Sequence, residues 1–288
     1  MNKKPIGVIG AGVIGKGVAQ SLAQADYPVV LIDKLAARLD EALEEIKRNA
    51  RAYKMLQPGG QHLNVEATIR NIQGSTDFDS LANCGYVIEN VTEKWSIKKD
   101  VYSILDRVCA QQAIFAANTS AIPITKIAAA TKRPEQVIGM HFMNPVPLKN
   151  TVEVIRGYHT SEQTLTLSLQ LLASLGKEGI VVNDSPGFVS NRVLMLTINE
   201  AIFIVQEGVS SAEAIDRLFK NCFGHKMGPL ETADLIGLDT ILYSLEVLYE
   251  CFADSKYRPC PLLARMVEAG VLGKKSGKGF YNYSLSAG

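Results

Sequence analysis

Hydrophobic and polar positions in the first two thirds of the chain follow two alternating patterns. Short runs of apolar, often β-branched residues, such as 5–10 and 28–33, have the length of buried strands, and apolar residues recur at helical spacing between them. Residues 39–56 keep the helical pattern throughout, with Leu39 and Ile46 on one face. Strands and helices that alternate at this pitch predict a mostly parallel sheet covered by helices on both faces.

The pattern changes after the apolar run at residues 179–183. Beyond an Asp-Ser-Pro-Gly break at 184–187, apolar positions recur with a period near that of a helix, and Gly, Pro and Ser separate the segments. We therefore expect an α/β domain over residues 1–184 and an all-α domain over residues 185–288. The second domain is small and rich in Leu, Ile, Val and Phe, so we expect it to form a homodimer. That it also binds substrate is implied by the family resemblance described below.

A glycine-rich turn follows the first predicted strand and opens the first predicted helix. Its candidate cofactor-binding residues are Gly10, Gly12, Val13, Ile14 and Gly15. Gly10 permits the tight turn, Gly12 lets a pyrophosphate approach the backbone, and Gly15 lets helix and strand pack closely. The helix N-terminus offers N–H groups to the phosphates. The strand–turn–helix context predicts a dinucleotide-binding domain of the Rossmann type.

The second predicted strand ends at Asp33. A carboxylate at this point can accept hydrogen bonds from both ribose hydroxyls of NAD, and it would repel the 2′-phosphate of NADP. Lys34 and Arg38 lie nearby in the sequence and could soften that preference. We therefore predict that the cofactor is NAD rather than NADP.

Composition limits the other classes of partner. The 288 residues are 47% hydrophobic and 20% charged with a net charge of +1, so no overall field would draw the protein to nucleic acid or a membrane surface. No apolar run reaches the roughly 18 residues needed to span a bilayer. Residues 1–12 lack the long apolar stretch of a secretory signal, so we expect a cytoplasmic protein. The histidines and cysteines lack metal-ligand spacing, and we expect no metal site.

His141 and Glu153 are the candidates for acid–base chemistry. His141 ends a predicted strand, at the sheet edge where doubly wound folds place their sites, and Glu153 lies on a strand that returns after the turn at 144–147. A nicotinamide enzyme that oxidises an alcohol needs a base for the hydroxyl proton, and histidine suits this role. A carboxylate on the far ring nitrogen would orient the ring. Taken alone, a histidine among apolar residues is more often a structural core residue than a catalytic one.

Seven segments resemble, in order and spacing, the L-3-hydroxyacyl-CoA dehydrogenase family, in particular its 3-hydroxybutyryl-CoA dehydrogenase branch. They are GAGVIGKGVAQ, VIENVTEKWSIKKDV, ANTSAIPIT, HFMNPVPLKNTVEV, SPGFVSNR, MGPLETADLIGLDT and GKKSGKGFYNY. The resemblance covers nearly the whole chain. It implies an NAD-dependent, reversible oxidation of an (S)-3-hydroxyacyl thioester to a 3-oxoacyl thioester.

The resemblance also implies roles for individual residues. His141 looks like the family's base, with Glu153 as its partner. Ser120 is similar to the serine that bonds the substrate oxygen near the nicotinamide, and Asn191 is similar to the asparagine that closes the site from the helical domain. The positions where the family contacts NAD correspond to Glu93, Lys98, Ser120, Asn144 and Lys275. The sequence context of Ser120 and Asn191 also allows turn or cap chemistry.

Three segments depart from the family pattern. Residues 149–151 (Lys-Asn-Thr) are polar where the family is usually mostly apolar, Asn90 and Thr92 replace small or apolar residues, and residues 55–67 replace a short charged turn. These changes leave the predicted pair of His141 and Glu153 intact. They leave open which acyl group the protein acts on and which carrier holds it.

The carrier question depends on basic residues of the second predicted helix. Lys47, Arg51 and Lys54 fall on one helix face, with Arg48 near it. This face could meet the phosphates of CoA, could meet an acidic acyl carrier protein, or could be solvated and balanced by nearby acidic residues. We expect a short-chain 3-hydroxyacyl-CoA substrate. The alternative is a short polar hydroxyacyl unit on an acyl carrier protein, in polyketide or other secondary-metabolite extender-unit biosynthesis.

Two other classes of protein share parts of the pattern. β-Hydroxyacid dehydrogenases have a dinucleotide domain and a helical tail but use a lysine as the key catalytic residue. A structural or sensing protein could bind NAD without turnover. The pairing of His141 with Glu153 argues against the first class, and the intact set of four candidate catalytic residues argues against the second.

Overall fold

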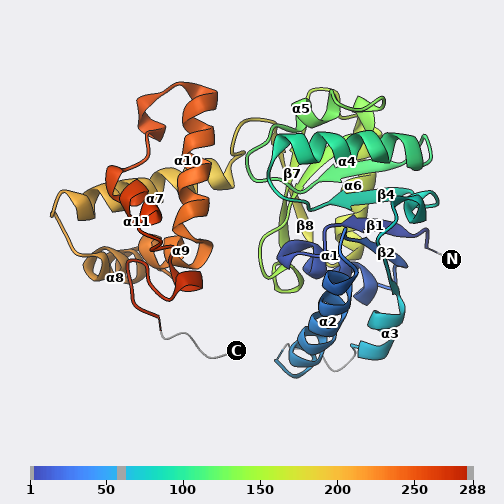
Figure 1. The fold of residues 1–288 in the computed structure, drawn as a ribbon, viewed down its shortest axis with the longest axis horizontal. Coiled ribbons are helices and arrows are strands. Elements are labelled where there is room, and N and C mark those ends of the chain that lie inside the picture. Colours follow the sequence, from blue (N-terminus) through green and yellow to red (C-terminus); the bar gives the residue numbers. More distant parts are fainter. Residues whose placement is uncertain (1–2, 57–62, 284–288) are drawn as a thin grey trace. The chain divides into compact units, whose positions relative to one another are not determined.

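The computed structural model describes residues 3–56 and 63–283, which form two compact units that divide between Ser185 and Pro186 (Figure 1). Residues 57–62, which belong to the unusual segment 55–67, lie outside the described residues. Each unit is described below on its own.

The first unit is built around a sheet that has eight strands within the described residues. The strands are β1 (Ile6–Ile9), β2 (Val29–Ile32), β3 (Ile72–Ser75), β4 (Tyr86–Glu89), β5 (Ile114–Ala117), β6 (Val137–His141), β7 (Thr151–Arg156) and β8 (Glu178–Asn183). Their order is β3-β2-β1-β4-β5-β6-β7-β8. The pair β6–β7 is antiparallel and the other neighbouring pairs are parallel. The predicted mostly parallel sheet is confirmed.

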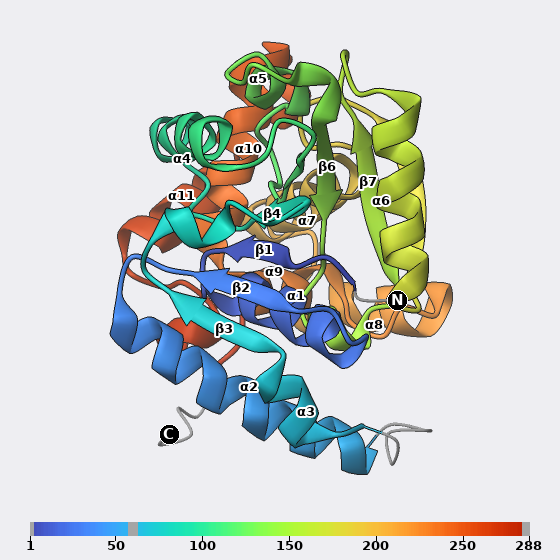
Figure 2. The same cartoon turned by 90° about the vertical axis from the view of Figure 1, so that its right-hand side faces the viewer.

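Helices cover both faces of this sheet (Figure 2). They are α1 (Val13–Gln24), α2 (Ala36–Leu56), α3 (Val65–Arg70), α4 (Trp95–Val108), α5 (Ile124–Ala128) and α6 (Glu162–Ser174). Short 3₁₀ turns are η2 (Phe78–Leu81), η3 (Pro134–Gln136) and η4 (Val146–Leu148). Because side chains alternate along a strand, Ile88 and Met140 join the core under α1, α2 and α6, whereas Phe115 meets the ring of Tyr102 on α4.

The predicted amphipathic helix is α2. Leu39 and Ile46 are buried in the core of the first unit, so the helical spacing of these residues in the sequence corresponds to the face that packs on the sheet. The basic residues Arg51 and Lys54 lie on the exposed part of the same helix.

The second unit is helical, as predicted from its periodicity. It contains α7 (Ser190–Gln206), α8 (Ala212–Phe223), α9 (Pro229–Ile236), α10 (Leu238–Phe252), α11 (Pro261–Glu268) and the 3₁₀ turns η5 (Ser255–Tyr257) and η6 (Lys274–Ser276). The described part of the tail beyond α11 is not an α-helix. Asp234 on α9 holds it by accepting the N–H groups of Phe280 and Tyr281 at 3.0 Å each. None of the described helices is both long enough and apolar enough to cross a membrane.

Candidate active site

His141 and Glu153 face each other across the antiparallel pair β6–β7. The register places the two residues directly opposite, and Nδ1 of His141 lies 3.0 Å from Oε2 of Glu153. Both side chains are buried, with 6% and 9% of their surface exposed. Opposite residues of an antiparallel pair project from the same face of the sheet, so this hairpin is sufficient to bring the two together.

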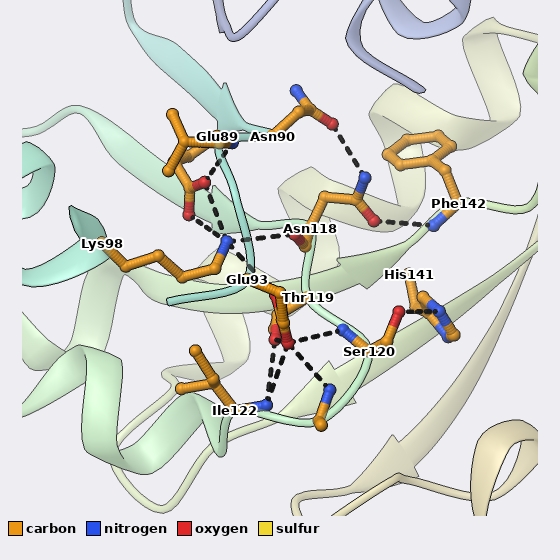
Figure 3. A network of polar contacts seen from close by, with 12 residues as sticks. Glu89, Asn90, Glu93, Lys98, Asn118, Thr119, Ser120, Ile122, His141 and Phe142 are labelled. Atoms are coloured by element: carbon orange, nitrogen blue, oxygen red, sulfur yellow. Dashed lines mark hydrogen bonds and ion pairs between the residues drawn. The ribbon is translucent and has the colours of Figure 1, made fainter. Parts of the chain in front are cut away.

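The contact with Glu153 determines which ring nitrogen of His141 is open to other groups. An ionised carboxylate only accepts hydrogen bonds, so in a neutral ring Nδ1 carries the proton and Nε2 keeps its lone pair. Oγ of Ser120, which follows β5, lies 3.1 Å from Nε2 (Figure 3). Serine, histidine and a carboxylate are thus connected in the order found in hydrolase triads. The same arrangement suits a histidine that takes a proton from a substrate hydroxyl bound beside Ser120.

Glu93 holds the loop that carries Ser120. Its Oε1 accepts hydrogen bonds from the N–H groups of Ser120, Ala121 and Ile122, at 3.1, 3.0 and 3.3 Å, and from the hydroxyl of Thr119. These bonds fix the backbone on both sides of the Ser120 hydroxyl. Glu93, which the resemblance associates with NAD, therefore also positions Ser120.

Lys98 lies inside the first unit and its side chain is fully buried. Its Nζ donates to the two carboxylate oxygens of Glu89 at 2.9 and 3.0 Å and to the carbonyl oxygen of Asn118 at 3.3 Å, and it lies 3.7 Å from Oε2 of Glu93. Burial raises the pKa of Glu89, and the ammonium of Lys98 opposes that rise. The ammonium of Lys98 thus joins the end of β4 to the loops that carry Glu93 and Asn118.

The turn between β1 and α1 leaves space where a pyrophosphate would lie. A Cβ on Gly15 would lie 1.8 Å from the carbonyl oxygen of Gly10, and Gly10 itself has φ +91°, so the fold itself requires both glycines. A Cβ on Gly12 would meet no atom within 4 Å. The first backbone hydrogen bond of α1 runs from Lys16 N to Gly12 O, so the N–H groups of residues 13–15 face the open N-terminus.

Next to this turn the structure places an exposed valine and a buried carboxylate. Val13 is 62% exposed at the start of α1, whereas Ile14 packs against the core. Asp33 is buried at the end of β2, where its Oδ2 accepts the N–H of Ala11 at 2.9 Å and its Oδ1 that of Leu35 at 3.2 Å. A carboxylate tied to the glycine turn in this way is suitably placed to accept hydrogen bonds from ribose hydroxyls.

The remaining predicted residues are spread over both units. Asn144 is exposed after β6, in the loop between His141 and Glu153. Asn191 lies in the first turn of α7, and Lys275 lies in η6, where its Nζ pairs with Asp239 of α10 at 2.5 Å. Both belong to the second unit. The polar residues 149–151 are exposed where the chain enters β7.

Two supporting contacts were not predicted. Asn118, which follows β5, bonds to Phe142 directly after the candidate base. Lys177 has a buried ammonium that donates to the carbonyl oxygens of Val146 and Lys149 at 2.7 Å each, and burial lowers its pKa. Lys177 therefore holds the loop that links β6 to β7. Its only signal in the sequence is a charged residue between a glycine and an apolar strand.

Comparison with known proteins associates the two units with two matching families. The family described as "3-hydroxyacyl-CoA dehydrogenase, NAD binding domain" matches residues 5–185. The family described as "3-hydroxyacyl-CoA dehydrogenase, C-terminal domain" matches residues 187–283. The two matches cover nearly all of the chain.

Similar proteins match over their full length. A probable 3-hydroxybutyryl-CoA dehydrogenase of Bacillus subtilis is 47% identical over 98% of each chain. A 3-hydroxybutyryl-CoA dehydrogenase of Bradyrhizobium diazoefficiens is 47% identical over 97% of this chain and 95% of its own. The crystal structure of (S)-3-hydroxybutyryl-CoA dehydrogenase from Ralstonia eutropha has a TM-score of 0.91 and 42% identity, over 98% of this chain and 99% of that chain.

Proposed function

The chain belongs to the 3-hydroxyacyl-CoA dehydrogenase family and is an NAD-dependent oxidoreductase, and we propose that it interconverts short-chain (S)-3-hydroxyacyl-CoA and 3-oxoacyl-CoA thioesters. The observation that carries the proposal is the hydrogen-bonded set Ser120–His141–Glu153 at the sheet edge where β5 and β6 end, in the unit that holds the NAD turn. The names of the most similar relatives favour a four-carbon acyl group.

In the proposed reaction His141 is the base. When bound, NAD supplies the acceptor for the hydride that leaves C3 of the substrate. Nε2 of His141 takes the proton of the C3 hydroxyl, and Glu153, on the opposite nitrogen, stabilises the positive ring that results. Ser120 donates a hydrogen bond to the same substrate oxygen and so fixes its distance from His141. In the reverse direction His141 returns the proton to the oxygen of the 3-oxo group.

We assign the other candidates to the binding of cofactor and of substrate. The glycine turn holds the pyrophosphate and Asp33 the adenosine ribose, and Asn144 and Lys275 are proposed to contact NAD. Glu93 is proposed to act on both sides, because it fixes the Ser120 loop and still has 25% of its side chain exposed. Asn191 of α7 is proposed to contact the substrate.

CoA is the carrier that we propose. The relatives named above are CoA enzymes by name, and Arg51 and Lys54 of α2 present exposed cations that suit the phosphates of CoA. Lys47, on the same face, is half-buried. An acyl carrier protein would also be attracted to this face, so the carrier requires a direct comparison.

The experiment follows NADH oxidation with one acetoacetyl group on three carriers: CoA, an acyl carrier protein and N-acetylcysteamine, which lacks phosphate. We expect the highest kcat/KM with CoA. Replacing Lys47, Arg51 and Lys54 together by Gln should raise KM for the CoA thioester about tenfold, the effect of roughly 1.4 kcal/mol of binding, and leave the N-acetylcysteamine thioester unchanged. Replacing the exposed Lys99 and Arg107 of α4 is the matched control. Activity confined to the carrier protein would contradict the proposed carrier.

We also propose that the second unit forms a homodimer. Leu218 and Phe223 on α8 and Leu235 on α9 are 56%, 69% and 56% exposed, and exposed apolar side chains in such numbers mark protein–protein surfaces. Sedimentation equilibrium should give twice the mass of one chain, and a monomer at micromolar concentration would contradict the proposal.

A further inference from the structure

A bridge of two side-chain amides crosses the sheet edge next to the proposed base. Nδ2 of Asn118, after β5, donates to Oδ1 of Asn90, after β4, at 2.8 Å. Oδ1 of Asn118 accepts the N–H of Phe142 at 3.1 Å (Figure 3). Phe142 follows His141 directly in the chain. The bridge therefore links the ends of β4, β5 and β6.

Backbone groups fix the direction of both amides. The N–H of Phe142 can only donate, so Asn118 must turn its oxygen toward it, and its NH₂ group then faces Asn90. Asn90 donates its own NH₂ group to the carbonyl oxygen of Ile88 at 3.1 Å and so presents its oxygen to Asn118. Reversal of either amide would bring donor to donor or acceptor to acceptor.

The bridge is placed where the strand ladder ends. The last residue pair of β6 and β7 is His141 with Glu153, so the next N–H along β6, that of Phe142, lies beyond the ladder. Asn118 supplies the acceptor for that group. The main chain of Asn118 is itself held, because its N–H donates to Glu89 O at 2.9 Å and its carbonyl accepts from Lys98.

The other end of the bridge lies against the dinucleotide turn. The N–H of Asn90 donates to Ile9 O at 2.8 Å, directly before Gly10. A Cβ on Gly10 would come within 2.8 Å of the carbonyl oxygen of Asn90, and a Cβ on Gly15 would lie 3.6 Å from the Cβ of Asn90. Asn90 therefore contacts the turn proposed to bind pyrophosphate and is connected through one amide to the residue after His141.

We propose that Asn90 and Asn118 are positioning residues, which hold the end of β6, and with it the ring of His141, in a fixed place relative to the NAD turn. The inference rests on the proposed function, because it takes His141 as the base. Asn90 is one of the departures from the family pattern noted in the sequence. With a small apolar side chain at position 90, the amide of Asn118 loses the partner that fixes its direction.

Kinetics of Asn90→Ala, Asn118→Ala and the double variant test the bridge. Each single change should lower kcat about 10- to 100-fold, the range expected when a reacting group is misplaced by about 1 Å, with KM for NADH nearly unchanged. The double variant should be no slower than Asn118→Ala, because both changes break one connection. Asn71→Ala is the matched control: Asn71 also donates from its side chain to a carbonyl, that of Ala23, but lies beside β3 at the sheet edge.

A conservative variant separates positioning from a general loss of structure. In Asn90→Asp a carboxylate still accepts from Asn118 although it loses the hydrogen bond to the carbonyl oxygen of Ile88. The loss of kcat should therefore be smaller than in Asn90→Ala, while the new negative charge beside the pyrophosphate site raises KM for NADH about tenfold. Equal losses of kcat in Asn90→Ala and Asn90→Asp, additive effects in the double variant, or a wild-type kcat in Asn90→Ala would each overturn the bridge.

Hydrogen exchange tests the same bridge without catalysis. Amide exchange at Phe142, followed in a peptide that covers residues 137–145, should become at least tenfold faster in Asn90→Ala and stay unchanged in Asn71→Ala. Unchanged exchange in Asn90→Ala would refute the bridge even if the wild-type protein is inactive on acetoacetyl-CoA. An inactive wild type with faster exchange in Asn90→Ala would instead refute the proposed function and retain the bridge.

Discussion

At the scale of single residues, Asp33 combines two tasks that a substitution can separate. Its carboxylate accepts the N–H groups of Ala11 and Leu35, and we propose that it also accepts ribose hydroxyls. Asp33→Asn keeps an acceptor oxygen for the turn but removes the charge that repels a 2′-phosphate. Hydrogen bonds to charged groups contribute about 1.5–3 kcal/mol, so kcat/KM with NADH should fall roughly tenfold or more.

The selectivity of the same variant is the sharper measurement. The ratio of kcat/KM for NADPH to that for NADH should rise at least tenfold in Asp33→Asn, since one cofactor loses a favourable contact and the other loses a repulsion. Steady-state kinetics with both cofactors give this ratio directly. An equal fall in kcat/KM with NADH and NADPH would mean that Asp33 only stabilises the glycine turn and does not select the cofactor.

The structure brings two of the predicted residues together because their geometry is local. His141 and Glu153 lie on two strands joined by a short connection, so hairpin pairing alone brings them together. Asn118 and Lys98 could not be placed in this way. Asn118 bonds to residues that follow β4 and β6, and Lys98 reaches the carbonyl of Asn118 after β5. The spacing of residues along the chain does not give the order in which these strands pair.

At the scale of elements, the buried ion pair between α4 and β4 makes a testable contribution to stability. Lys98→Met would remove the ammonium and leave Glu89 buried without its counter-charge. Breaking a buried pair from one side costs about 3–5 kcal/mol, so the free energy of unfolding in urea should fall by that order at about pH 8. Lys99→Met, on the exposed side of the same helix, should change it little.

The pH dependence of this loss has a definite sign. Burial raises the pKa of Glu89 in the folded protein, and removal of Lys98 raises it further. The folded variant therefore holds a proton more tightly than the unfolded chain, and its stability falls as pH rises from the unfolded pKa through the folded one. The difference from wild type should be smaller at about pH 5 than at about pH 8. A difference that grows on acidification would contradict the assigned pair.

The sequence did not predict the elements that are defined by backbone hydrogen bonds rather than by a pattern of apolar side chains. The buried face of α2 could be predicted because Leu39 and Ile46 keep helical spacing. β3 was missed because it is a four-residue edge strand in which only Ile72 is buried, and its pairing with β2 defines it rather than its composition. The non-helical conformation of the tail after α11 was also not predicted. Asp234 holds this tail by accepting backbone N–H groups, and such bonds leave no periodic pattern of apolar residues in the sequence.

At the scale of the whole molecule, the chain leaves the first unit from an anchored residue. Asp184 is the residue before Ser185, the last residue of the first unit. Its two carboxylate oxygens accept the N–H groups of Ile124 and Thr125, at 3.1 and 2.7 Å, at the start of α5. The end of the first unit is thereby fixed to the segment that follows the Ser120 loop.

The family could be predicted from the sequence because its motifs are spread over both units, and their joint order is far more specific than a single glycine turn. The carrier could not be predicted, because a basic helix face has the same appearance whether it meets CoA, an acidic protein or water. The supporting contacts of Asn90, Asn118 and Lys177 also required the structure, since each joins segments that are distant in the sequence.

Turnover of acetoacetyl-CoA by wild type and His141→Gln tests the central claim most directly. Glutamine keeps a polar side chain but cannot take a proton, so kcat should fall about 10²- to 10⁴-fold, while NADH binding, followed by its fluorescence, stays unchanged. His159→Gln, at an exposed histidine on the loop after β7, is the matched control and should keep wild-type activity. Undiminished turnover in His141→Gln would contradict the assignment of His141 as the base.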